Sequence, residues 1–316
     1  MAPMFLVSNI AMVKAGMQSG IAANFPSLNY RKEGELESVL DELNAEQNVS
    51  KGKYGINLIV QKSNPLYVKH LEICVTKKVP FYITSLGSPA EVIEKAHGYG
   101  AKVLCDVTNL AHAKKCYDLG CDGFIAVGQG AGGHAGNNPL LLLVPALKKA
   151  FPNKIVIGAG GVATGDALTS ILALGGEGAS IGTRFIASTE AGVNEGYKNA
   201  IVDSTMEDIV MSTKISGTPC TVINTDYAKK IGYTQNWFER LLSTNKTTKK
   251  YFKMLVQFRG MKKLEQSVAG GNYKTLWVAG KSSEMVDDII PCAEIIERLK
   301  KETFESLGRL GSIIED

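Results

Sequence analysis

A single histidine, His134, lies inside the glycine-rich segment GQGAGGHAG (128–136), which directly follows the apolar stretch DGFIAV. An imidazole gains and loses a proton near neutral pH, so a histidine presented in this way can act as a general acid or base. The first six residues of the segment also match G-x-G-x-x-G, the fingerprint of a dinucleotide-binding turn. The segment is therefore either a nucleotide-binding turn or a loop that presents His134.

Two features of the surrounding sequence argue against the nucleotide-binding turn. Such a turn runs directly into a helix, whereas HAGNNP delays the next helix to about Leu140. It also needs an acidic residue at the end of the following strand, and KIVIGAGG has none. We therefore predict that His134 is catalytic and lies on a mobile loop at the C-terminal end of a strand. The helical stretches around His70, His97 and His112 indicate surface positions for these side chains.

Two glycine clusters further along the chain predict a phosphate site. Gly160 and Gly161 end one apolar run, and Gly182 and Thr183 end the next. Glycines allow backbone amides to approach an anion closely, and barrel enzymes bind phosphate after their seventh and eighth strands. An enzyme of the inosine monophosphate dehydrogenase type would share this feature. Its chemistry also requires a cysteine in a glycine-rich loop, and no cysteine of this chain has that setting.

Composition limits the class of protein. The chain is 45% apolar and 21% charged, which is typical of a packed globular protein, and its net charge of +4 is too small to indicate a nucleic-acid partner. No apolar run is long enough to cross a membrane, and MAPMFLVSNI lacks the basic start of a signal peptide, so we expect a cytoplasmic protein. The cysteines are scattered, so we expect buried thiols and no metal site: Cys74, Cys105, Cys116, Cys121, Cys220 and Cys292.

Short β-branched runs alternate with helical patterns over most of the chain, which predicts a parallel sheet with helices outside it. Counting MAPMF (1–5) as a first strand gives eight strands and hence a (β/α)8 TIM barrel, with an open sheet as the alternative. A strand at 1–5 is either short or missing a few preceding residues. The other predicted strands are 19–24, 54–60, 80–85, 101–107, 123–127, 154–159 and 178–182. The predicted helices lie near 35–44, 64–78, 89–98, 109–119, 140–150 and 164–174.

The alternation stops after FIASTEAG (185–192). Residues 206–274 have a helical pattern without strands, and they hold 12 Lys and Arg against 5 Asp and Glu. We predict a helical lid over 206–274, inserted into a barrel made of 1–205 and 275–316, with a long amphipathic helix at the end. A basic lid is either a solvated surface or a surface that meets an anionic substrate or cofactor.

Five segments resemble the nitronate monooxygenase family, formerly called 2-nitropropane dioxygenases, which are FMN-dependent barrels. They are APM (2–4), GINL (55–58), AGGHAG (131–136), GAGGVATGDAL…LALGGEGASIGTRFIAS (158–188) and AGKSSEMVDDIIPCAEII (279–296). The wider flavin group also contains NAD(P)H:quinone reductases and FMN-dependent enoyl-acyl-carrier-protein reductases. The resemblance spans nearly the whole chain.

The resemblance implies a role for individual residues. His134 matches the family's catalytic histidine, and Asp106 lies where the family often places a polar residue against the ribityl chain or ring. The residues implied to surround the flavin are Ala2, Pro3, Met4, Asn57, Gln129 and Gly133. Those implied to hold the phosphate are Gly160, Gly161, Gly182, Thr183, Gly280 and Ser282.

The resemblance also implies an activity, the oxidation of alkyl nitronates by FMN and dioxygen to a carbonyl compound and nitrite. Many relatives have Gln or Met where Lys281 stands, which bears on the substrate class. Two alternatives therefore stay open: an NAD(P)H-dependent reductase of a quinone or enoyl thioester, and a non-catalytic flavin-binding barrel. The expected partners are a small-molecule substrate and dioxygen, with a homodimer left open.

Overall fold

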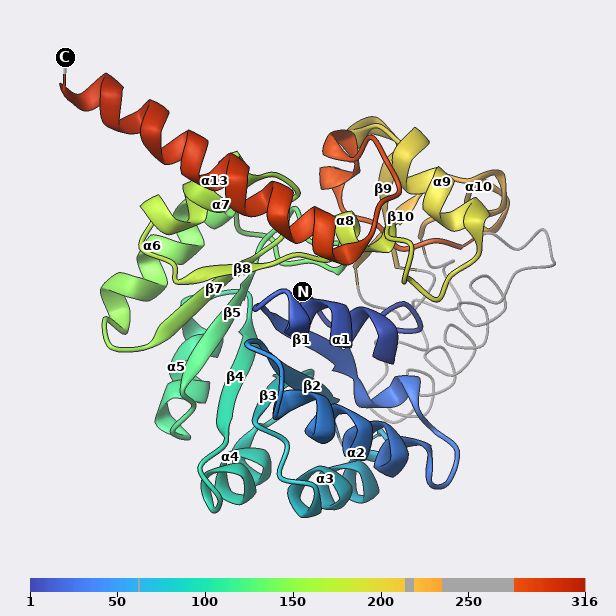
Figure 1. Ribbon diagram of the computed structural model, residues 1–316, viewed down its shortest axis with the longest axis vertical. Helices are drawn as coiled ribbons and strands as arrows, with labels where there is room; N and C mark the ends of the chain where they lie inside the picture. Colours follow the sequence, from blue (N-terminus) through green and yellow to red (C-terminus); the bar gives the residue numbers. More distant parts are fainter. Residues whose placement is uncertain (62, 214–218, 235–275, 316) are drawn as a thin grey trace.

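Seven parallel strands form the central sheet of the computed structural model, which describes residues 1–61, 63–213, 219–234 and 276–315. Strands that follow one another in this sheet along the chain are also neighbours in space, in the order β1-β2-β3-β4-β5-β7-β8 (Figure 1). All seven match predicted strands to within a few residues, which confirms an α/β fold of the TIM-barrel type. They are β1 (Ala22–Pro26), β2 (Lys53–Ile59), β3 (Phe81–Ser85), β4 (Lys102–Val107), β5 (Gly123–Val127), β7 (Ile155–Ala159) and β8 (Gly178–Ser180).

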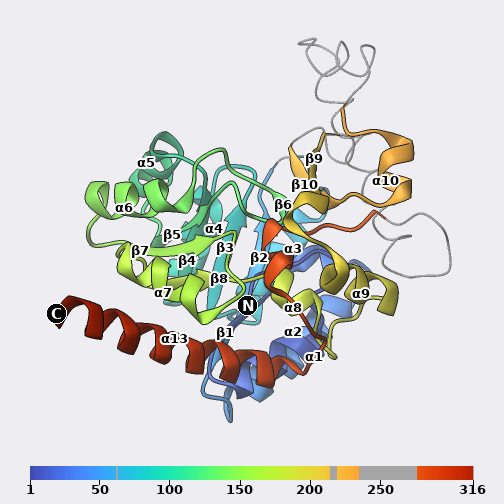
Figure 2. The same ribbon diagram turned by 90° about the horizontal axis from the view of Figure 1, so that it is seen from above.

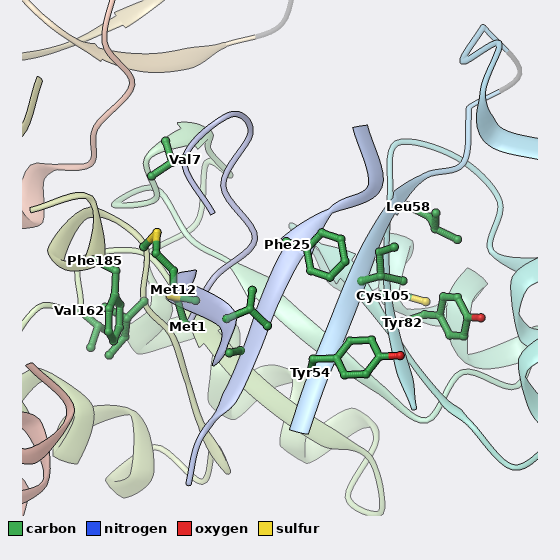
Figure 3. Close-up of a cluster of buried hydrophobic side chains, with 14 of the residues drawn as sticks. Met1, Val7, Met12, Phe25, Tyr54, Leu58, Tyr82, Cys105, Val162 and Phe185 are labelled. Carbon is green, nitrogen blue, oxygen red and sulfur yellow. The ribbon is translucent and has the colours of Figure 1, made fainter. Parts of the chain in front are cut away.

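Both faces of the sheet carry apolar side chains, as expected for parallel strands. Tyr54, Tyr82 and Cys105 point outward under the helices and are at most 1% exposed; Figure 3 shows them among the buried side chains. Alternate residues point inward. There, Ile83 and Leu104 belong to the lining of a cavity of about 730 Å³ in the barrel interior.

Helices connect the strands and cover the outside of the sheet (Figure 2). Two of them begin at predicted caps: the Asn109 side chain accepts a hydrogen bond from the His112 amide, and the Thr164 hydroxyl accepts one from the Ala167 amide. Helix α1 (Ile10–Gln18), which begins after Asn9, has no counterpart among the predicted helices. The connecting helices are α2 (Glu35–Gln47), α3 (Tyr67–Thr76), α4 (Ala90–His97), α5 (Leu110–Asp118), α6 (Leu140–Ala150) and α7 (Gly165–Ala173).

The predicted first strand, 1–5, is not a strand, so that expectation is wrong. Only its first two residues join the sheet: the Met1 nitrogen donates to the Ala22 carbonyl at 2.7 Å, and the Ala2 amide donates to the Ile181 carbonyl at 2.8 Å. The chain then leaves as a turn, because Pro3 has no amide hydrogen to continue a ladder. Met1 and Ala2 thus bridge β1 to the end of β8, and α13 (Cys292–Glu315) passes over the same side (Figure 1).

The predicted helical lid contains strands. Residues 206–213 and 219–234 form a 3-10 turn, β9 (Ile209–Ser212), β10 (Cys220–Ile223) and α10 (Asp226–Ile231), so the helical expectation is wrong at the two strands. Residues 214–218 and 235–275 lie outside the described residues, and the division into barrel and lid stays a prediction. β10 pairs with β9 and with β6 (Gly133–His134), both antiparallel, in a second, three-stranded sheet.

The remaining short elements follow the last barrel strand. They are α8 (Thr183–Ile186), α9 (Glu195–Asp203) and the 3-10 turn η3 (Lys281–Met285). Over the described parts of the chain, every helix is too short or too polar to cross a membrane.

Candidate functional site

The segment around His134 is held in place by the β9–β10 hairpin. In the register of β6 and β10, Cys220 lies opposite His134 and Thr221 opposite Gly133. The Thr221 hydroxyl donates to the Ala131 carbonyl at 2.9 Å and is 3.4 Å from the Gly133 carbonyl. Glycine content alone predicts a mobile loop here; the structure instead fixes the loop by strand pairing with residues about ninety positions away in sequence.

The local environment keeps the His134 imidazole uncharged. The His134 side chain is exposed, but nearby protein atoms displace part of its hydration, which lowers the pKa of His134 below its usual value. At neutral pH the ring is therefore a proton acceptor. Cys220, which shares its face of the small sheet, is a buried thiol whose burial raises its pKa to about 12, so it adds no charge beside the ring.

Three glycine-containing loops pack backbone against backbone beside this segment. The Gly161 amide donates to the Gly130 carbonyl at 3.1 Å, and the Gly280 amide donates to the Thr183 hydroxyl at 3.0 Å. Gly160 has φ +119°, and a Cβ there would lie 2.4 Å from the Ala131 nitrogen. Only glycine fits that contact. The loops that sequence analysis assigned to the histidine and to the phosphate thus form one rim.

The N-terminal segment completes the rim next to Gly182. A Cβ at Gly182 would lie 3.6 Å from the Ala2 Cβ and 3.5 Å from the Met4 Sδ, so the three predicted residues are neighbours. The segment is fixed by Ser8, whose hydroxyl donates to the Ala2 carbonyl at 3.2 Å and accepts from the Met4 amide at 3.0 Å.

Polar side chains meet at the C-terminal ends of three neighbouring strands. Asn57 Nδ2 donates to the Ser85 hydroxyl at 2.7 Å, and that hydroxyl donates to Asp106 Oδ2 at 2.5 Å. Loss of hydration raises the pKa of Asp106 to about 6, and the Ser85 hydrogen bond opposes the rise. The sequence motifs identify Asn57 and Asp106 but not Ser85. The available signal was its position as the last residue of β3, on the inward face shared with Ile83.

Two further predicted residues, Gln129 and Ser282, lie elsewhere around the site. Gln129 is exposed, and its backbone amide donates to the Asn138 carbonyl at 3.0 Å. Ser282 is buried in η3, beside Ser283. The turn is anchored by Arg184, a further residue that sequence analysis missed; its buried guanidinium pairs with Asp288 at 2.7 Å.

The histidines outside the candidate site divide into two kinds. His97 is exposed and lies 2.9 Å from Asp122, and His112 is half-buried. His70, predicted at the surface, is only 3% exposed within α3, so that expectation is wrong. Burial lowers the pKa of His70, which keeps the side chain neutral in the core.

The backbone and side-chain polar groups of the site fit a flat, polar ring with an attached phosphate better than they fit a metal ion. The rim presents backbone at its glycine positions, where side chains are absent, and Asn57 Oδ1 has no donor among the described residues. Within those same residues, no three His, Cys, Asp or Glu side chains are grouped as metal ligands. The arrangement can therefore bind a flavin-like group through its backbone and place one neutral imidazole at the same end of the barrel.

Two solved structures with this fold superpose on nearly the whole chain. FabK from Thermotoga maritima superposes with a TM-score of 0.82 at 26% identity, covering 99% of this chain and 94% of that protein. A nitroalkane oxidase from Streptomyces ansochromogenes superposes with a TM-score of 0.78 at 21% identity, covering 98% and 96%.

Curated relatives match at the level of sequence. A hydroxy-methyl-oxo-octahydroindene-carboxyl-CoA dehydrogenase from Rhodococcus jostii is 23% identical, over 88% of this chain and 85% of its own. A probable nitronate monooxygenase from Staphylococcus saprophyticus is 28% identical, over 76% and 67%. The family model described as nitronate monooxygenase matches residues 6–302. The chain is therefore an oxidoreductase of the nitronate monooxygenase family.

Proposed function

We propose that this chain is an FMN-dependent nitronate monooxygenase, which oxidises an alkyl nitronate with dioxygen to a carbonyl compound and nitrite. The observation that carries the proposal is the placement of His134. The residue is fixed by β6–β10 pairing beside a glycine rim, with a pKa lowered so that the ring is neutral. The family match and the probable nitronate monooxygenase among the relatives support it.

Each part of the rim has a defined task in this proposal. The backbone around Gly182 and Thr183 and the loop at Gly160 bind the phosphate, while residues 2–4 and Asn57 contact the ring. The Gly161 and Gly280 amides already have protein acceptors, so their main contribution is to hold the loops together. FMN, when bound, supplies the electron-transfer chemistry.

His134 is the proton-transfer residue in this proposal. With a neutral nitroalkane, the uncharged imidazole accepts the proton from the carbon next to the nitro group and so produces the nitronate in the site; with a nitronate supplied directly, which has already lost that proton, a protonated imidazole instead stabilises the bound anion. General acid–base assistance of this kind contributes about 10² to 10⁴ in rate. The buried thiol of Cys220, whose pKa is raised to about 12, stays protonated, so the imidazole is the proton acceptor of this pair.

A second candidate is an NAD(P)H-dependent flavin reductase acting on a quinone or enoyl thioester. The superposition with FabK over nearly the whole chain favours it, as does the dehydrogenase of a CoA ester among the relatives. Fold alone does not separate the candidates, because one barrel can serve many reactions.

An oxygen electrode separates the two candidates. The purified protein is reconstituted with FMN and supplied in turn with propyl-2-nitronate and with NADH or NADPH. The proposal predicts oxygen uptake and nitrite release with the nitronate and no uptake with the nicotinamides. Reaction with a nicotinamide alone would establish the reductase instead. Failure of the protein to bind FMN would overturn both.

A further inference from the structure

Three polar side chains on β2, β3 and β4 form a continuous hydrogen-bond chain at the open end of the barrel. Asp106 Oδ2 accepts from the Ser85 hydroxyl at 2.5 Å, and the Ser85 oxygen accepts from Asn57 Nδ2 at 2.7 Å. The same Asn57 nitrogen donates to the Ile83 carbonyl at 3.2 Å. On β3 and β4 the inward side chains one step below, Ile83 and Leu104, are apolar and line the cavity.

The direction of each hydrogen bond follows from the chemistry of its partners. A backbone carbonyl can only accept, so the Asn57 nitrogen must face Ile83. The Ser85 hydroxyl proton goes to the Asp106 carboxylate, which leaves the Ser85 oxygen free to accept from Asn57. The amide of Asn57 is thereby locked in one orientation. Its Oδ1 points the other way, receives no hydrogen bond from any described residue and is not sealed from solvent.

The Asp106 carboxylate is poorly hydrated, which is unfavourable for a charged group, so its position calls for a functional explanation. Among the described residues, Ser85 is the one hydrogen-bond partner of Asp106, and no basic side chain pairs with the carboxylate. Such an arrangement destabilises the folded protein when Asp106 is charged, and costs of this kind are concentrated at functional sites. The cost is explained if the carboxylate orients the chain that ends at Asn57.

We propose that Ser85 and Asp106 are positioning residues of the flavin site, which hold Asn57 Oδ1 as a fixed acceptor for an N–H group of the flavin ring. This inference rests on the proposed FMN-dependent function. Neither residue needs to touch the cofactor; both act through Asn57.

The test measures FMN affinity and the midpoint potential of the bound flavin in matched variants. Ser85→Ala and Asp106→Leu break the chain. Ser85→Thr and Asp106→Asn keep a hydroxyl and an acceptor in place. Thr84→Val is the control, because the Thr84 hydroxyl bonds Cys105 on the opposite, outward face of the same strand. Thermal unfolding shows whether each variant folds.

We expect Ser85→Ala and Asp106→Leu to weaken FMN binding by about tenfold, the effect of losing one well-placed hydrogen bond to a buried polar group, and to shift the flavin potential. The two conservative variants and Thr84→Val should stay near the wild type in both measurements. Wild-type affinity and potential in Ser85→Ala, or equal losses in Thr84→Val, would overturn the inference while leaving the proposed function intact. A wild-type protein that binds no FMN would overturn both.

Discussion

At the scale of single residues, His134 determines the chemistry that the site can perform. Its type and its glycine neighbours are visible in the sequence, but its neutral state depends on atoms that fold around it. We expect His134→Ala to keep FMN and to lower turnover by about 10² to 10⁴. Steady-state oxygen uptake with the parent nitroalkane, 2-nitropropane, from which the proton must be removed, measures the change, and exposed His97→Gln is the control. Unchanged turnover in His134→Ala would remove the residue from the mechanism.

Asp106 allows a prediction about stability and pH. Its folded pKa of about 6 lies above the ordinary value of about 3.9 for the unfolded chain. Between these values the folded state binds more protons than the unfolded state, so stability falls as pH rises from 4 to 6. Asp106→Asn should therefore raise the melting temperature of the FMN-free protein at pH 8 and leave it unchanged near pH 4. A lower melting temperature for the variant at pH 8 would contradict the assigned pKa.

At the scale of helices and strands, the periodicity of apolar residues predicts the elements that depend on local sequence alone. The strands from β2 to β7 and the helices between them follow from alternating patterns and end signals, and Asn109 and Thr164 cap helices as expected. The pairing of β10 with β6 cannot be predicted from local patterns, because it joins segments about ninety residues apart through strands of four and two residues. The predicted strand at 1–5 is absent, because Pro3 ends the hydrogen-bond ladder after two residues.

The β6–β10 pairing gives a test of how His134 is held. Thr221→Val removes the hydroxyl that donates to the Ala131 carbonyl but keeps the shape of the side chain. We expect turnover to fall by about tenfold, because a small misplacement of a catalytic group is costly, while FMN affinity is unchanged. Thr221→Ser should retain most activity. Equal activity in the Val and Ser variants would show that the Thr221 hydroxyl does not help to position the histidine.

The glycine rim gives a second test at this scale. Gly160→Ala places a Cβ against the Ala131 nitrogen and should abolish FMN binding. Gly100→Ala, between α4 and β4 and outside the rim, is the matched control. Its φ of +84° is strained for alanine, but the added Cβ would have no neighbour within 4 Å, so the expected cost is about 1 kcal/mol of stability. Isothermal titration with FMN compares them, and equal binding by both variants would contradict the close packing of the rim.

At the scale of the whole molecule, the fold brings together residues from both ends of the chain. Residues 2–4, 130–134, 160–161, 182–183 and 280 meet at one end of the barrel, although they span nearly the full sequence. Sequence motifs identify most of these residues. They miss Ser85, Thr221 and Arg184, whose roles arise from neighbours that only the folded chain provides.

The substrate is the property that the barrel leaves most open, because FabK and a nitroalkane oxidase share this fold. The most direct measurement is anaerobic mixing of the FMN-loaded protein with propyl-2-nitronate or with NADH, followed by flavin absorbance. The proposed function predicts rapid reduction of the flavin by the nitronate, slowed in His134→Ala, and no reduction by NADH. Rapid reduction by NADH with no response to the nitronate would contradict it.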